Sequence, residues 1–217
     1  MRPAAELLIV LIVLGNLALL GSSRLTGLIR LVAAQGLLLG AVPLLARGQA
    51  WTAEILFLAV AAGLLKGVVF PVLLERAMRD AGIRREVEPF VGFSLSQVAG
   101  VAILAASFVI ARRLPVPPGP LARAATPAAF ATILTGLFLI VTRRKALTQA
   151  LGYLVLENGI YLFGVSIGQR VPLVVELGVL LDVFVAVFVM GIAIFHIRRE
   201  FDHLDVDRMT ELTDWTP

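Results

Sequence analysis

Ionisable side chains inside long apolar stretches are the residues of this chain that could do chemistry. Glu157, Lys66 and Asp182 each lie within a run of mostly apolar residues. A charged side chain at the centre of a membrane helix costs about 2.5 to 3.5 kcal/mol on insertion scales, so such residues usually face the interior of a bundle and mark an ion or substrate path. Weaker candidates, neutral or nearer the ends of such runs, are Gln35, Glu54 and Glu176.

A polar stripe surrounds Glu157. Its residues step by four, and side chains four apart share one face of a helix: Gln149, Tyr153, Glu157 and Tyr161. Glu157 is at the centre of this stripe. The following pair, Asn158 and Gly159, is poor in helix propensity and is expected to admit a local wide turn or a water, a common device at membrane functional sites.

Each candidate also has a structural interpretation. Glu157 could be protonated and hydrogen-bonded, with the tyrosines and glutamine only joining helices. The long stem of Lys66 could carry its ammonium toward an interface. Asp182 is too short for that, and a pair with Lys66 would lower the cost of both. The sequence alone does not decide whether these two residues meet.

The elements that must position these residues are membrane helices. The 217 residues are 59% hydrophobic and only 16% charged, whereas about a quarter of an ordinary soluble domain is charged. A bilayer core about 30 Å thick needs roughly 20 mostly apolar residues per helix. The sequence predicts an all-α, polytopic bundle of about seven helices in a single domain, 1–196, with a tail, 197–217. The expected helices cover residues 4–21, 26–46, 52–75, 90–111, 125–142, 149–168 and 172–196.

The basic residues predict the orientation, because lysine and arginine accumulate on the cytoplasmic side. With seven helices, one side carries eleven of them: Arg24, Arg76, Arg79, Arg84, Arg85, Arg143, Arg144, Lys145, Arg198, Arg199 and Arg208. The other side carries six: Arg2, Arg47, Arg112, Arg113, Arg123 and Arg170. The N-terminus is therefore expected outside and the C-terminus in the cytoplasm. Charges scattered over short loops do not favour a nucleic-acid surface.

The residue types that hold redox cofactors are scarce. The chain has no cysteine, so thiolates cannot ligate an iron–sulfur cluster and no disulfide forms. Its two histidines, His196 and His203, are poorly placed for a membrane-embedded metal or haem. No glycine-rich phosphate loop, nucleophile elbow or HExxH pattern is present. We therefore expect no catalytic site and no cofactor in this chain.

A weak internal repeat relates the two halves of the chain. A shift of 122 residues places Gln35 on Glu157 and Glu54 on Glu176, while few other residues agree. Chance explains such matches about as well as duplication does. A true repeat would make helices one to three and five to seven parallel copies, an arrangement known in some transporters.

A family resemblance extends over most of the chain, including Gln35 and residues 66–71, and is most specific in the C-terminal half. The segment 152–159, GYLVLENG, the segment 174–178 and the tail motif Leu204-Asp205-Val206 resemble hydrogenase-4 component E, a membrane subunit of group 4 nickel–iron hydrogenase and formate hydrogenlyase complexes. This family is related to the K-type small subunit of complex I, in which two intramembrane glutamates belong to a chain of polar residues used for proton transfer. The register departs from that pattern, because aligning Asn158 leaves Leu154 where the first glutamate would be.

The resemblance implies the surroundings of the chain. The nickel–iron and iron–sulfur centres would belong to partner subunits: antiporter-like and other membrane subunits plus a peripheral hydrogenase-type arm, in a prokaryotic cytoplasmic membrane. Within this setting the residues favour a proton path with Glu157 as carrier and with Lys66 and Asp182 as charge partners. The alternatives are a structural spacer, a small subunit of a related antiporter or complex I-like assembly, and a stand-alone solute transporter, which the small size disfavours.

Overall fold

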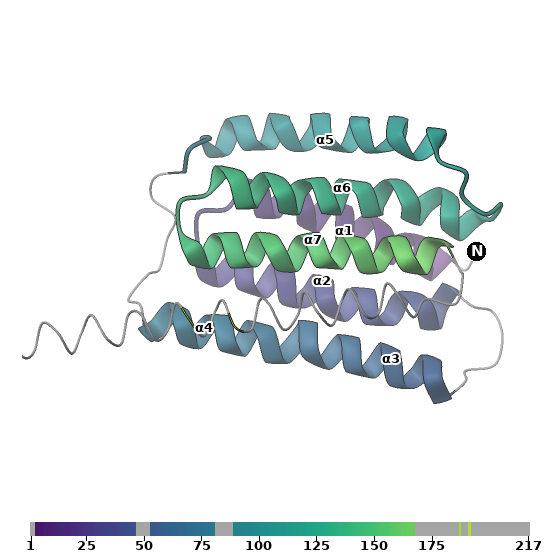
Figure 1. Ribbon diagram of the computed structural model, residues 1–217, viewed down its shortest axis with the longest axis horizontal. Helices are drawn as coiled ribbons and strands as arrows, with labels where there is room; N and C mark the ends of the chain where they lie inside the picture. The colour runs from purple at the N-terminus through teal and green to yellow at the C-terminus, as the bar shows by residue number, and fades with distance from the viewer. Residues whose placement is uncertain (1–2, 47–52, 81–88, 168–186, 188–190, 192–217) are drawn as a thin grey trace, which may run out of the picture.

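The computed structural model describes residues 3–46, 53–80 and 89–167 and positions 187 and 191, and every regular element in this part of the chain is helical. The expected all-α membrane fold is confirmed (Figure 1). Five helices are long and apolar enough to cross a membrane: α1 (Pro3–Gly21), α2 (Leu25–Ala46), α5 (Phe93–Arg113), α6 (Pro120–Thr142) and α7 (Ala146–Ile167). The run 172–196 and the tail 197–217 lie outside the described residues, so the count of seven stays a prediction.

The third predicted helix, 52–75, is one continuous segment with a wide turn inside it. It consists of α3 (Ala53–Leu64), the π-helix η1 (Leu65–Val69) and α4 (Phe70–Asp80). A π-helix bonds each amide to the carbonyl five residues back, which adds a residue to the turn and is frequent at functional sites. The prediction of a wide turn at Asn158 and Gly159 was wrong, because α7 is a regular α-helix at these residues. The widened turn lies at Leu65–Val69 instead.

Helix boundaries differ from prediction where proline is involved. α6 begins at Pro120, five residues before the predicted start at 125. Proline is tolerated in the first turn of a helix, where its missing N–H would have no helical partner. The helix therefore starts earlier than its apolar run, at a proline that suits the first turn.

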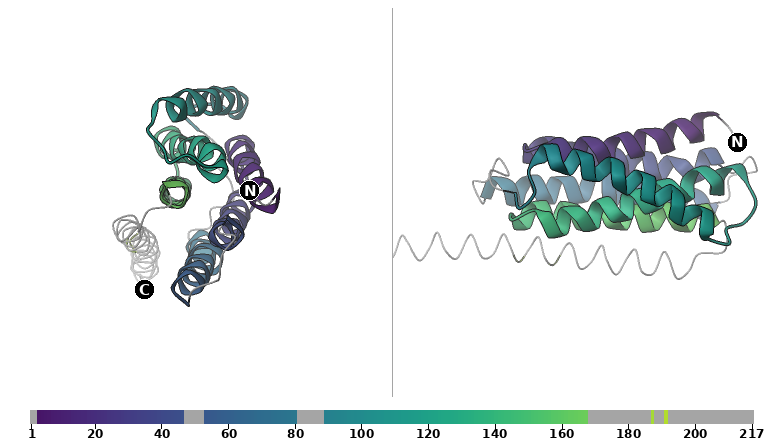
Figure 2. Two further views of the ribbon diagram at one scale, coloured as in Figure 1. Left: turned by 90° about the vertical axis from the view of Figure 1, so that its right-hand side faces the viewer. Right: turned by 90° about the horizontal axis from the view of Figure 1, so that it is seen from above.

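Four helices close into a ring. α1 packs against α2 and α6, and α7 packs against the same two helices from the other side. α5 lies outside the ring against α6 and α1, and the α3–η1–α4 segment lies against α2, with α4 also reaching α7 (Figure 2). The ring is thus the interior of the described bundle.

The apolar core is divided into two clusters along the ring. One contains residues 19–20 of α1, 25–32 of α2, 70–77 of α4 and 147–155 of α7. The other contains Ile9 and Ile12, Leu39 and Val42, residues 125–129 of α6, and Leu162. The middle of every ring helix lies between the two clusters, and that level holds the polar residues described below.

Glycines let two helix pairs approach closely. A Cβ on Gly159 would lie 2.6 Å from the Ile133 backbone nitrogen and 2.9 Å from the Ala129 oxygen, so α7 touches the backbone of α6. A Cβ on Gly36 would lie 2.7 Å from Lys66 Cβ, so α2 touches η1 in the same way. Small residues at helix contacts are the usual means of close packing in membranes, where no hydrophobic effect drives helices together.

The proposed repeat stays a prediction. The helices that it relates, α1 with α6 and α2 with α7, pack side by side and run in the same direction. The third pair includes residues outside the described part of the chain. Adjacent parallel copies are compatible with duplication but do not demonstrate it.

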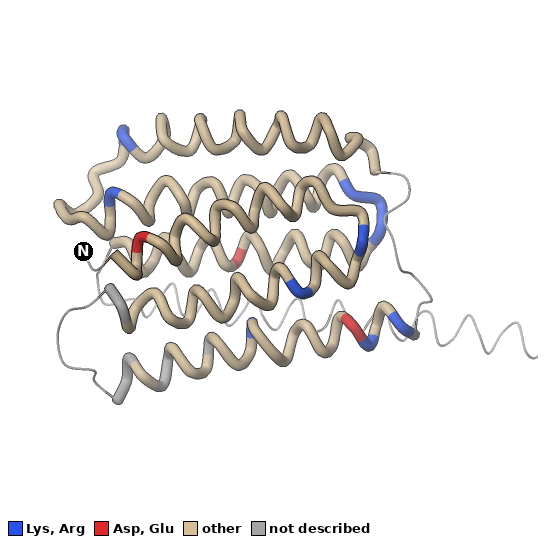
Figure 3. The backbone as a smooth tube through the Cα atoms, turned by 180° about the vertical axis from the view of Figure 1, so that it is seen from behind, with Lys and Arg blue, Asp and Glu red and all other residues tan. Residues whose placement is uncertain are grey.

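Basic residues gather at one end of the bundle (Figure 3). We call this the basic end: α1, α4 and α6 finish there, and α2, α5 and α7 begin there. Its described basic residues are Arg24, Arg76, Arg79, Arg143, Arg144 and Lys145, whereas the opposite end carries Arg112, Arg113 and Arg123. This asymmetry agrees with the predicted orientation, in which the basic end is cytoplasmic, and the orientation itself stays a prediction.

The close contact between α6 and α7 predicts an effect on stability. Gly159→Ala is expected to lower the stability of the purified protein in lipid nanodiscs by about 1 to 3 kcal/mol, because the added methyl meets backbone atoms that cannot move aside. Gly15→Ala is the matched control, since a Cβ there meets nothing within 4 Å. Equal thermal unfolding curves for the two variants would contradict this account of the packing.

The orientation can be measured with single cysteines because the chain has none. Gly92 and Gly119 both have open space around a Cβ, and they precede α5 and α6 at opposite ends of the bundle. We expect a membrane-impermeant thiol reagent to label Gly119→Cys in intact cells and Gly92→Cys only after the membrane is opened. The reverse pattern would place the basic end outside.

Candidate functional site

An ion pair joins the third helical segment to α7 in the middle of the bundle. The ammonium of Lys66 in η1 donates to Oε1 of Glu157 in α7, and these side chains are 6% and 2% exposed. Two of the predicted site residues therefore meet each other. Two opposite charges in direct contact offset part of the cost of removing each from water.

The π-helix lies at the position from which Lys66 reaches this partner. Lys66 is its second residue, and the backbone of α2 at Gly36 is pressed against the Lys66 Cβ and carbonyl carbon, at 2.7 and 2.8 Å from an added Cβ. A side chain at position 36 would push η1 away from α2. The wide turn and the glycine together fix where the lysine side chain begins.

A chain of hydrogen bonds runs from α7 through the ring. Asn158 Nδ2 donates to Gln35 Oε1 at 3.2 Å, and Gln35 Nε2 donates to Asn16 Oδ1 at 2.8 Å. Asn16 Nδ2 then donates to Thr132 Oγ1 at 2.8 Å, and Thr132 Oγ1 donates to the Ala128 carbonyl at 2.8 Å. We call these four side chains the amide ladder. It connects α7, α2, α1 and α6 in turn.

The direction of the amide ladder is fixed at two points. Gln35 Nε2 also donates to the carbonyl oxygen of Ile12 at 3.3 Å, and a carbonyl can only accept. The Thr132 hydroxyl is likewise committed to the Ala128 carbonyl. The amide of Gln35 must therefore turn its nitrogen toward α1 and its oxygen toward Asn158.

The ladder and the ion pair form one polar layer between the two apolar clusters. All six side chains are buried: Asn16, Gln35, Lys66, Thr132, Glu157 and Asn158. Asn16 and Thr132 were not among the predicted site residues. Their signal was present, because each is a polar residue near the middle of an apolar helix, but neutral side chains are common there as helix contacts.

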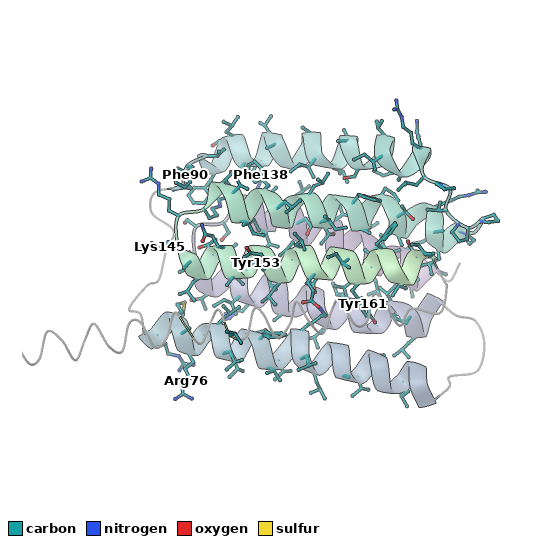
Figure 4. All side chains as sticks on the ribbon, viewed as in Figure 1. Arg76, Phe90, Phe138, Lys145, Tyr153 and Tyr161 are labelled. Atoms are coloured by element: carbon teal, nitrogen blue, oxygen red, sulfur yellow. The ribbon has the colours of Figure 1, made fainter. Side chains whose placement is uncertain are left out.

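The predicted stripe on α7 divides among three environments. Tyr153 packs against the apolar cluster nearer the basic end and Tyr161 against the other, on either side of Glu157 (Figure 4). The ring centroid of Tyr161 is 6.0 Å from the Lys66 nitrogen. Gln149 instead donates to the Arg143 carbonyl at 2.9 Å. Only Tyr161 among the three faces the ion pair.

The remaining predicted residues are not brought to this site by the described structure. Asp182 and Glu176 lie outside the described residues, so the predicted pair of Lys66 with Asp182 stays untested while Glu157 holds the lysine. Glu54 belongs to α3, but its side chain is likewise outside what is described. Arg30, near the start of α2, is exposed on the bundle surface.

Arg143 is a buried junction that the sequence assigned to a loop. Its side chain is among the largest fully buried ones, at 1% exposed. The guanidinium donates to the Leu20 carbonyl at 3.0 Å and the Val91 carbonyl at 3.4 Å, and it lies 4.8 Å from the Phe93 ring. It thereby ties the ends of α1, α5 and α6 together through backbone groups that the helix termini leave open.

Known proteins include relatives of this chain. A family model for NADH-ubiquinone/plastoquinone oxidoreductase chain 4L matches residues 125–214. The protein Rv0085 of Mycobacterium tuberculosis is 36% identical over 205 residues, which are 94% of this chain and 93% of that protein. Hydrogenase-4 component E of Escherichia coli and of Shigella flexneri is 29% identical over 161 residues, 73% of this chain and 74% of each relative. The chain belongs to the hydrogenase-4 component E family. No solved structure matches it.

Membership of the hydrogenase-4 component E family makes this chain a multi-pass membrane subunit of a complex I-like assembly. Glu157 lies inside the region that matches chain 4L, whereas Lys66 precedes that region. The ion pair therefore joins the two halves of the chain. Among the described residues, no group of three or more histidine, cysteine, aspartate or glutamate side chains could hold a metal ion.

The contact between Lys66 and Glu157 predicts a thermodynamic coupling. Lys66→Met or Glu157→Gln alone is expected to destabilise the protein by about 3 to 5 kcal/mol, because each removes one partner of a buried ion pair. The double variant should be closer to wild type than the sum of the single losses. Thermal unfolding of all four proteins in nanodiscs measures the cycle, and additive losses would show that the two residues act independently.

Proposed function

We propose that the Lys66–Glu157 pair is a proton-carrying site in the membrane arm of a hydrogenase-4 or formate-hydrogenlyase type complex. The single observation that carries this proposal is a carboxylate and an ammonium in contact at the buried middle level of a membrane bundle. Intramembrane ionisable residues are rare and usually lie on ion paths or proton relays. A titratable carboxyl held beside a fixed cation can take up and release a proton as its surroundings change.

Each side chain has a distinct role in this proposal. Glu157 carries the proton, and Lys66 stabilises its carboxylate form. Tyr161 faces the pair, and Tyr153, Glu176, Glu54 and Asp182 are candidates to extend the path toward either membrane surface. Gln35 holds the ladder in place, because a side-chain amide has no proton that titrates in the physiological range. The partners would be antiporter-like membrane subunits and a peripheral arm holding nickel–iron and iron–sulfur centres, in a prokaryotic cytoplasmic membrane.

A structural spacer is the second candidate function. The observation that favours it is the amide ladder, whose four side chains bond one another and the backbone across the ring. Such a ladder specifies helix register without any transport. The two candidates differ in what they require of Glu157.

A neutral replacement of the pair separates the two candidates. Lys66→Met together with Glu157→Gln keeps similar volumes and removes both charges of the pair, so the complex should assemble. We expect proton uptake into vesicles, measured per electron transferred, to fall to about half or less, because the neutral pair cannot accept or release a proton. The rate of the redox reaction is measured in the same preparation.

The matched control is Glu75→Gln, which also removes one carboxylate from this chain. Glu75 lies in α4, and its side chain is 35% exposed and forms a 3.8 Å pair with Arg79. Its loss should leave the ratio of protons to electrons unchanged. A neutral-pair complex that pumps at the wild-type ratio would identify the chain as a structural subunit.

A further inference from the structure

We propose that Lys66 is a tethered cation that makes this site selective for protons over alkali metal ions. The inference rests on the proposed function and specifies the ion that the site carries. The Lys66 ammonium contacts Oε1 of Glu157, at the place where a metal ion bound by this carboxylate would lie.

A sodium ion needs several oxygen ligands, as hard cations do, whereas a proton needs one lone pair. At Glu157 a sodium ion would have to share the carboxylate with an ammonium already in contact with it. Like charges a few ångströms apart repel strongly where little water screens them. A proton avoids this repulsion in large part, because it forms a neutral carboxyl that can still accept a hydrogen bond from Lys66.

The nearby amide oxygens are also committed. Gln35 Oε1 accepts from Asn158, and Asn16 Oδ1 accepts from Gln35. The bond from Gln35 to the Ile12 carbonyl fixes this direction, so the glutamine cannot turn its oxygen to a new ligand without losing a buried hydrogen bond. Each of these amide oxygens therefore has at most one lone pair left for a metal ion, in a direction that the ladder fixes.

Lys66 has little room to withdraw from the carboxylate. Its Cβ and carbonyl carbon are pressed against Gly36 of α2, and the Tyr161 ring lies 6.0 Å from its nitrogen. The aromatic face adds an attraction that favours a cation at this position. Both contacts favour the ammonium at its position beside Glu157.

The transfer step involves one proton only. A proton from the path binds a carboxylate oxygen of Glu157, which changes the net charge of the pair from zero to +1. Lys66 keeps all three of its protons throughout. Release of the same proton from Glu157 restores the original pair.

The test uses the purified complex in lipid nanodiscs and infrared difference spectroscopy on exchange of choline chloride for sodium chloride. The carboxylate band of Glu157 is identified by its loss in the Lys66→Met and Glu157→Gln double variant. In wild type we expect sodium to leave this band unshifted. In Lys66→Gln we expect sodium to shift it, and in vesicles to slow proton uptake several-fold. Lys66→Arg is the matched control, because it keeps a cation at the pair, so its Glu157 band should stay unshifted by sodium.

A sodium-induced shift of the Glu157 band in wild type would overturn the inference, and so would a Lys66→Gln complex as insensitive to sodium as Lys66→Arg. The wild-type measurement decides the question even where Lys66→Gln does not assemble. Failure of the proposed function looks different, since the neutral-pair complex would then pump normally whatever sodium does at Glu157.

Discussion

The buried contact between Lys66 and Glu157 is the constraint on which the rest of the bundle depends. Neither charge is tolerable alone between apolar clusters, because each would lose its hydration with nothing in return. The two must therefore meet in one geometry. The π-helix, the bare backbone of Gly36 and the close approach of α6 to α7 all act on the positions of η1 and α7, the two elements that carry the pair.

The amide ladder extends this constraint across the ring. It begins at Asn158, the neighbour of Glu157 in the chain, and ends on a backbone carbonyl of α6. Because its direction is fixed by carbonyls that only accept, its dipoles cannot reverse without leaving a buried group unsatisfied. The ladder thus provides a rigid, neutral frame beside a site whose charge can change.

Much of the site could be predicted from residue type alone. Glu157 and Lys66 were identified because they are charged residues deep in apolar runs. Gln35, a neutral polar residue midway along α2, was identified by its similar position. Lys66 was predicted as a charge partner of Glu157, but their direct contact could not be predicted, because it depends on how η1 packs on α2. The pair of Lys66 with Asp182 stays a prediction. The π-helix was not predicted, although Gly67 lies in it and Pro71 follows it, whereas Asn158 and Gly159 have poor propensity yet stay helical under tertiary packing. Arg143 was counted among loop charges, but its guanidinium donates to the carbonyls of Leu20 and Val91 and is buried.

The distance between the paired residues along the chain has a consequence for biogenesis. Lys66 precedes Glu157 by 91 residues. At synthesis rates of about 5 to 20 residues per second, the ribosome needs roughly 5 to 20 s to make the intervening segment. During that interval the third hydrophobic segment is already synthesised while its lysine still lacks the carboxylate. The long lysine stem lets the ammonium reach toward the lipid headgroups in that interval, so the lysine meets Glu157 only after α7 has been made.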